Sequence, residues 1–153
     1  MREDFTLTAM HRLCLLASLL TLGACGTPTP QGPVVEDGVL EVGDLTLGSG
    51  EYQDVRSVRV GAGQWLSVRV VAQGFDPYLI LRSPADRQSE IDDSVEGDTT
   101  SVETVVRSDD SGTWDISVTS YAPGESGSYR LTYEVTDTQP ADKKAAPEAT
   151  SDA

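Results

Sequence analysis

The chemistry available to this chain is concentrated in an acidic stretch between residues 86 and 115. This stretch contains ten acidic residues and only two basic ones, Arg87 and Arg107. The acidic residues are Asp86, Glu90, Asp92, Asp93, Glu96, Asp98, Glu103, Asp109, Asp110 and Asp115. Carboxylates crowded in this way repel one another unless water or a bound cation lies between them. The stretch is therefore either a calcium-binding loop or a solvated acidic loop that keeps the protein in solution.

Two calcium-binding arrangements can be drawn from these residues. In the first, an EF-hand-like loop takes its positions one, three, five, six and twelve from Asp92, Ser94, Glu96, Gly97 and Glu103. That motif needs flanking helices, whereas the flanking sequence is typical of strands. The second arrangement is an irregular loop site with oxygen ligands drawn from Asp76, Asp92, Asp93 and Asp98, and it is the calcium site that we predict.

The N-terminal segment has the pattern of an export signal. An apolar run covers residues 13–24, follows Arg12, and is too short to span a bilayer. Two acidic residues near Met1 cancel the positive charge that such signals usually carry. Met10 is therefore the better candidate for the initiating residue of this signal.

The end of the apolar run contains a predicted modification site. Leu22, Gly23 and Ala24 lead directly into Cys25, and this order resembles the lipobox of bacterial lipoproteins, in which the cysteine is acylated and the chain is cut before it. We predict a signal peptide over residues 1–24, an acyl (palmitate) anchor on Cys25, and a domain outside the cytoplasm. Because Gly26 follows the cysteine, not aspartate, we expect the anchor in the outer membrane of a cell with two membranes.

Removal of the signal excludes whole classes of catalysis. The only histidine, His11, and the thiol of Cys14 are lost, while Cys25 is committed to lipid. No Ser-His-Asp or Cys-His arrangement can then be built, and no thiolate zinc site or disulfide. The net charge stays at −14, because residues 1–24 carry two acidic and two basic side chains. That charge argues against nucleic acid and anionic membrane surfaces as partners and favours cations and basic surfaces.

The mature chain divides into one domain with two arms. Residues 25–38 are rich in Pro, Thr and Gly and predict an extended tether, and residues 136–153 predict a disordered tail with the only two lysines. The stretch between them, 39–135, is long enough for one domain with a modest core.

Alternating apolar residues in this domain predict an all-β fold. The rows occupy every second position and place each set on one face of a strand: Val58 and Val60; Leu66, Val68 and Val70; Trp114, Ile116 and Val118; Tyr129, Leu131 and Tyr133. Turn-forming residues separate the rows, so we expect an antiparallel, jelly-roll-like sandwich of seven or eight strands without helices. Arg56 falls in phase with Val58 and Val60, an inward position that the pattern does not explain.

Three exposed side chains are candidates for ligand contact. Trp65 alternates out of phase with Leu66, so it points away from the expected core, with Arg69 on the same face. Tyr121 stands beside Pro123 in a turn. Trp65 has a structural alternative, since a lone outward tryptophan commonly packs beneath a loop or the chain terminus.

The order of these motifs resembles a known family, the bacterial pre-peptidase C-terminal domain, a β-sandwich related to the collagen-binding modules of collagenases. The resemblance covers about residues 45–135 and is carried by residues 54–64, by 75–81, by Asp92 with Asp93, and by 111–118 with 127–131. It implies a calcium-associated jelly-roll and a non-catalytic role in adhesion or substrate contact.

These observations predict a lipid-anchored envelope protein whose domain binds a protein or a glycan and is not an enzyme. The alternative is a structural or regulatory subunit that docks on a separate secreted protease or envelope complex. An aspartic protease would need two triplets like Asp110, Ser111, Gly112, and the chain has one. A carboxylate-pair glycosidase would need a cleft that so short a chain can hardly build.

Overall fold

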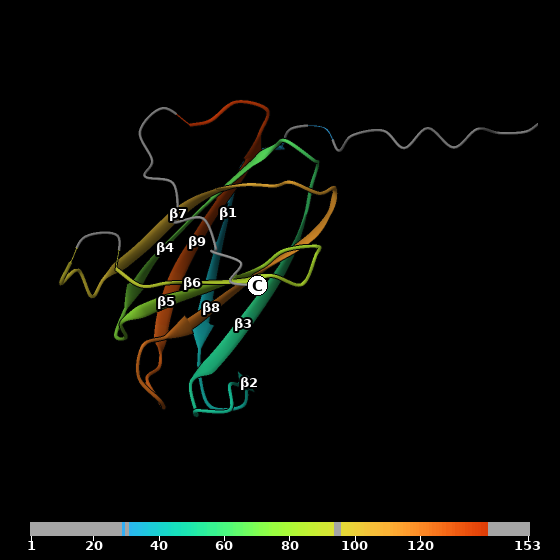
Figure 1. Ribbon diagram of the computed structural model, residues 1–153. Helices are drawn as coiled ribbons and strands as arrows, with labels where there is room; N and C mark the ends of the chain where they lie inside the picture. Colours follow the sequence, from blue (N-terminus) through green and yellow to red (C-terminus); the bar gives the residue numbers. More distant parts are fainter. Residues whose placement is uncertain (1–28, 30, 94–95, 141–153) are drawn as a thin grey trace, which may run out of the picture.

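The computed structural model describes residues 29, 31–93 and 96–140, and these residues contain nine β-strands and no helix (Figure 1). The strands are β1 (Gln31–Leu40), β2 (Leu45–Thr46), β3 (Tyr52–Val60), β4 (Trp65–Gln73), β5 (Pro77–Arg82), β6 (Gln88–Ile91), β7 (Ser101–Arg107), β8 (Gly112–Ser120) and β9 (Gly127–Thr136). The signal segment, Cys25 and the tail beyond residue 140 lie outside the described residues. The described part has no helix that could cross a membrane.

The strands form two sheets that pack face to face in an open sandwich. One sheet has the order β1-β9-β4-β7 and the other β2-β3-β8-β5-β6, and every neighbouring pair is antiparallel. The predicted all-β antiparallel sandwich is confirmed. The structure has nine strands where seven or eight were expected, because the tether segment supplies one and the two-residue β2 another.

The core lies between the sheets and is built from the alternating rows. Leu66, Val68 and Val70 of β4 are fully buried, and Ile116 of β8 is their equivalent in the other sheet. Each such side chain contributes about 1.5–3 kcal/mol when it leaves water. Trp114 and Tyr129 are buried as expected, while Tyr133 is half-buried at the margin of the core.

Strand β1 corrects the boundary expected between tether and domain. It begins at Gln31 and pairs with β9 from Val34↔Tyr133 to Leu40↔Gly127, so most of the predicted tether is a sheet strand. Its composition hid it, because Pro33, Gly38 and two acidic residues, all of types depleted in strands, interrupt its three valines. The strand forms because β9 offers it a full ladder of backbone hydrogen-bonding groups.

The same strand explains the inward arginine. Glu36 shares the inner face of β1, and its carboxylate forms an ion pair with Arg56 of β3 in the opposite sheet. One strand farther in, Tyr129 donates its hydroxyl to Asp54 of β3 at 2.6 Å. Burial, reinforced by this bond, raises the pKa of Tyr129, so its phenol stays protonated. These polar contacts join the two sheets along one open side of the sandwich.

The antiparallel register gives the sandwich two distinct ends. Gln31 pairs with Val135 and Trp65 with Thr136, so the chain enters and leaves at one end, which we call the entry end. Leu40 pairs with Gly127 at the opposite end. The connecting segments of that opposite end carry the candidate metal ligands and many other carboxylates, and we call it the acidic end.

Candidate functional site

Three of the four predicted calcium ligands meet at the acidic end. Asp76, Asp92 and Asp93 each offer a carboxylate oxygen, and these three atoms lie within 4.8 Å of one another. Asp76 immediately precedes β5, and the other two directly follow β6. Because β5 and β6 are antiparallel neighbours, with Leu79 opposite Ile91, the start of one strand lies beside the end of the other. The pairing of two strands thus creates the cluster.

The cluster contains carboxylate oxygens without partners. The Oδ1 atoms of Asp76 and of Asp93 are buried and accept no hydrogen bond. The other oxygen of Asp93 accepts the Gly97 N–H at 2.9 Å. Buried acceptors without partners are costly, and a hard cation that takes oxygen ligands would satisfy both. The residues present therefore fit a calcium ion.

The charge of Asp76 is disfavoured where it stands. Burial, followed by repulsion from Asp93 and Asp92, raises the pKa of its carboxyl group. In the unfolded chain the carboxyl titrates near the ordinary value of 3.8. As the pH falls, the carboxyl group of Asp76 therefore becomes protonated in the folded protein before it does so in the unfolded chain. The stability of the folded state rises as the pH falls through this raised pKa. A metal ion has the opposite effect, because it binds the ionised form.

Asp98 serves a different purpose. Its Oδ1 accepts the N–H of Thr100 at 2.9 Å and the hydroxyl of Thr100 at 2.6 Å, while its Oδ2 accepts the hydroxyl of Ser101 at 2.7 Å. These bonds lower the pKa of Asp98 to about 2, with the Thr100 hydroxyl the largest cause. The carboxylate thus closes the turn before β7 and is not among the three clustered ligands.

The EF-hand-like arrangement is not formed. Strands β6 and β7 flank the loop, and Glu103 lies within β7, where its carboxylate faces Arg69 of β4 across the ladder. Gly97 does make a sharp turn, with φ of +83°. Ser94 lies outside the described residues.

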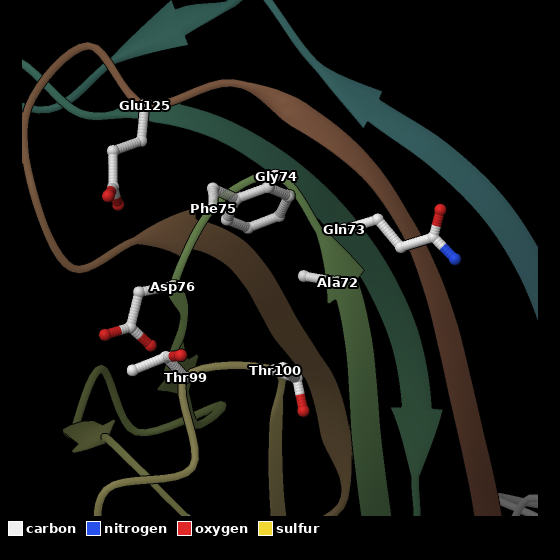
Figure 2. Close-up of a pocket in the computed structure, with 8 residues that line it drawn as sticks. All are labelled: Ala72, Gln73, Gly74, Phe75, Asp76, Thr99, Thr100 and Glu125. Atoms are coloured by element: carbon white, nitrogen blue, oxygen red, sulfur yellow. The ribbon is translucent and has the colours of Figure 1, made fainter.

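An open pocket of about 590 Å³ adjoins the cluster. Figure 2 shows the carboxylates of Asp76 and Glu125 on the same side of the pocket, and Phe75, a buried core residue, also lines it. Thr99 and Thr100 also line the pocket, and Thr99 lies beside Asp76. The lining therefore combines two carboxylates with hydroxyl groups, which suits a cationic or hydroxyl-bearing ligand.

The structure separates the three predicted ligand-contact residues: Tyr121 lies at the acidic end, Trp65 at the entry end and Arg69 midway along β4. Tyr121 is 62% exposed and its backbone N–H donates to the Asp76 carbonyl at 2.9 Å, so it lies beside the cluster of three aspartates. Trp65 is half-buried at the entry end, on the outer face of the sheet with Arg69. Strand β4 separates the ends by eight residue steps, or about 26 Å. Trp65 and Tyr121 cannot contact one small ligand together.

Two residues of this region were missed in the sequence. Glu125 lies in the turn between β8 and β9, where it was indistinguishable from a solvated turn residue. Tyr78 lies on the outer face of β5, and its hydroxyl donates to Glu90 at 3.1 Å. Burial and that bond raise the pKa of Tyr78 to about 12, so it stays a neutral phenol. The alternation of β5 placed Tyr78 outside the core but gave no sign that Tyr121 would lie near it.

Comparison of the chain with protein-family models finds no match, and comparison with curated proteins finds none either. The resemblance to the pre-peptidase C-terminal domain therefore stays a prediction, and the function is argued from the residues of the site.

Proposed function

We propose that this protein is a lipid-anchored component of the bacterial cell envelope whose non-catalytic sandwich binds Ca²⁺ and, at the same end, a protein or glycan ligand. The observation that carries the metal is the pair of buried Oδ1 atoms, on Asp76 and Asp93, that have no hydrogen-bond partner. The lipid anchor is supported by Cys25 at the end of the signal pattern.

The metal would act as a structural element of the acidic end. Asp76 follows β4 and precedes β5, whereas Asp92 and Asp93 begin the long connection to β7. A cation bound to all three would cross-link that connection to a strand of the sheet and remove the repulsion among the carboxylates. The loop and the pocket beside it would then be held in one conformation.

The ligand surface would comprise Tyr121, the pocket and Glu125. An exposed phenol ring can stack on a sugar or pack against a peptide, and Glu125 with Asp76 attracts positive charge. A glycan would use the hydroxyl groups of Thr99 and Thr100 as well. These features favour a ligand with basic side chains or many hydroxyl groups.

Thermal unfolding of the chain from Gly26, with chelator and then with a calcium titration, tests the metal. A ligand that binds only the folded state stabilises it by about 2.7 kcal/mol at a hundredfold excess over its Kd. For a domain of this size that raises the unfolding midpoint by roughly 10–20 °C. We expect a saturable rise with Ca²⁺ and a smaller one with Mg²⁺, which resists irregular coordination.

Substitutions separate a bound metal from general screening of charge. Asp76→Asn removes a ligand and one repelling charge, so we expect a higher midpoint without calcium and no further rise with it. Asp110→Asn, an exposed aspartate of the entry end, is the matched control and should leave the calcium response intact. Equal responses of the two variants would show that calcium acts only as an ion in solution.

A further inference from the structure

The two ends of the sandwich differ sharply in charge. The connecting segments of the acidic end hold nine carboxylates and, among the described residues, no arginine or lysine: Glu41, Asp44, Glu51, Asp76, Asp92, Asp93, Glu96, Asp98 and Glu125. In the part of the chain that the structure describes, the connecting segments of the entry end hold only four carboxylates, Asp86, Asp109, Asp110 and Asp137, together with Arg87. The negative charge of the domain is thus concentrated at one end.

The chain enters at the other end, close to the predicted anchor. Only six residue steps separate Cys25 from Gln31, the first residue of β1, and they span at most about 20 Å even when fully extended. From Gln31 to Leu40 the strand itself covers about 30 Å. A connection of about 20 Å is too short for the domain to turn over and set its acidic end on the membrane.

From these two observations we propose that the entry end faces the membrane that holds Cys25 and that the acidic end points away from it. This orientation rests on the proposed lipid anchor. In this orientation the entry end contacts one partner, the phospholipid headgroup layer. It also places the metal cluster and the pocket where a ligand approaches from the side facing away from the membrane.

Charge opposes the remaining arrangement, in which the sandwich lies on its side. That position would bring the carboxylates on the membrane-facing side of the acidic end close to anionic headgroups, where charges repel most strongly within about 8 Å, one screening length. The entry end meets less repulsion because its described connecting segments carry four carboxylates and one arginine, against nine carboxylates and no arginine in those of the acidic end. The short connection between Cys25 and Gln31 excludes an orientation with the acidic end on the membrane. Charge repulsion disfavours an orientation in which the sandwich lies on its side.

Trp65 then has a role other than ligand binding. It is half-buried at the start of β4, opposite Arg107 of β7 and Thr136 of β9. Tryptophan is enriched where one side of the ring is apolar and the other meets water, as at membrane interfaces. In the proposed orientation Trp65 lies on the membrane-facing end, where its exposed edge contacts headgroups.

Energy transfer to labelled lipid tests the orientation. The full chain, exported and acylated by a bacterial host, is placed in vesicles that contain anionic phospholipid and an acceptor-labelled lipid. A donor dye is attached to Asp110→Cys at the entry end or to Ser126→Cys at the acidic end, both exposed positions. No other thiol interferes, because Cys14 leaves with the signal and Cys25 is acylated. We expect the dye at position 110 to lose most of its emission and the dye at 126 to keep most of its own.

The outcomes separate the orientation from the anchor. Equal losses at the two positions, or a larger loss at 126, in protein that floats with the vesicles would overturn the orientation and leave the anchor standing. Protein without an acyl group by mass spectrometry that does not float would overturn the anchor and, with it, the orientation.

Tryptophan emission provides an independent readout. Trp114 is buried and its Nε1–H donates to Ser108 at 2.8 Å, so its emission should not respond to lipid. We expect the emission shift that accompanies anchoring to disappear in Trp65→Phe. A shift that persists in this variant would contradict headgroup contact by Trp65.

Discussion

At the scale of single residues, the molecule places two carboxyl groups of the same loop region in opposite electrostatic conditions. Asp98 accepts hydrogen bonds from Thr100 and Ser101, which favour its charged form, whereas Asp76 is buried beside two other aspartates, which disfavour it. Asp98 stabilises a turn, whereas the charge of Asp76 destabilises the folded state through electrostatic repulsion. Only Asp76 gains from a bound cation.

This contrast predicts a pH dependence of stability without calcium. The pKa of Asp76 is raised above its ordinary value of 3.8, so the unfolding midpoint should rise as the pH falls through that raised pKa. The pKa of Asp98 is lowered, so its stabilising contribution should be lost as pH falls below about 4. Thermal scans in chelator across this range measure both limbs. Asp76→Asn should remove the first limb and keep the second, and an unchanged first limb would contradict the assignment.

Gly38 is required by a close approach. A Cβ at this position of β1 would collide with the ring carbons of Tyr129, whose hydroxyl reaches Asp54 in the other sheet. Gly38→Ala must displace the ring, and overpacking of this kind costs about 1–3 kcal/mol. Urea unfolding measures the loss. Gly32→Ala, in the same strand with open space around the new methyl, is the matched control and should change little.

At the scale of elements, β1 is the part of the fold that the composition concealed. It is an edge strand with one neighbour, β9, and its inner face carries Glu36 in place of an apolar residue. An inward charge on an edge strand discourages pairing with another chain. Here the charge also has a partner, Arg56, so the same residue protects the edge and joins the two sheets.

The pairing of β1 predicts that a chain beginning at Val39 is much less stable than one beginning at Thr29. The shorter chain loses six paired residues of β1, Gln31 and Val34 to Gly38, and leaves most of the edge of β9 without a partner. Several backbone hydrogen bonds of about 1 kcal/mol each disappear, so we expect a loss of about 3–5 kcal/mol. Urea unfolding of the two chains measures it. Coincident unfolding curves would show that residues 31–38 act as a tether after all.

At the scale of the whole molecule, the arrangement of charge matters more than its total. Taken alone, the net charge of −14 predicts that anionic membranes repel this protein. In the folded domain the excess is collected at one end, about 30 Å from the point where the chain enters. The proposed anchor can therefore hold the domain close to lipid without forcing the carboxylates against it. The same separation keeps Trp65 and Tyr121 from sharing one ligand.

The sequence alone was sufficient for the all-β class, the inner rows and two members of the aspartate cluster, Asp92 and Asp93. Alternation of apolar residues is a local property, so the spacing of Leu66, Val68 and Val70 was enough to assign them to one face of a strand. Asp92 and Asp93 were recognisable as a pair because they are neighbours in the sequence, which is also a local property.

Contacts between distant segments were decided only by the tertiary structure. The strand β1 exists because β9 pairs with it, and Arg56 points inward because Glu36 lies across the sandwich. Asp98 was separated from the other three aspartates by hydrogen bonds within its own turn. The register of the ladders placed Trp65 and Tyr121 at opposite ends. Periodicity reports the environment of each residue along its own strand, whereas partners, ends and distances depend on how the strands pair.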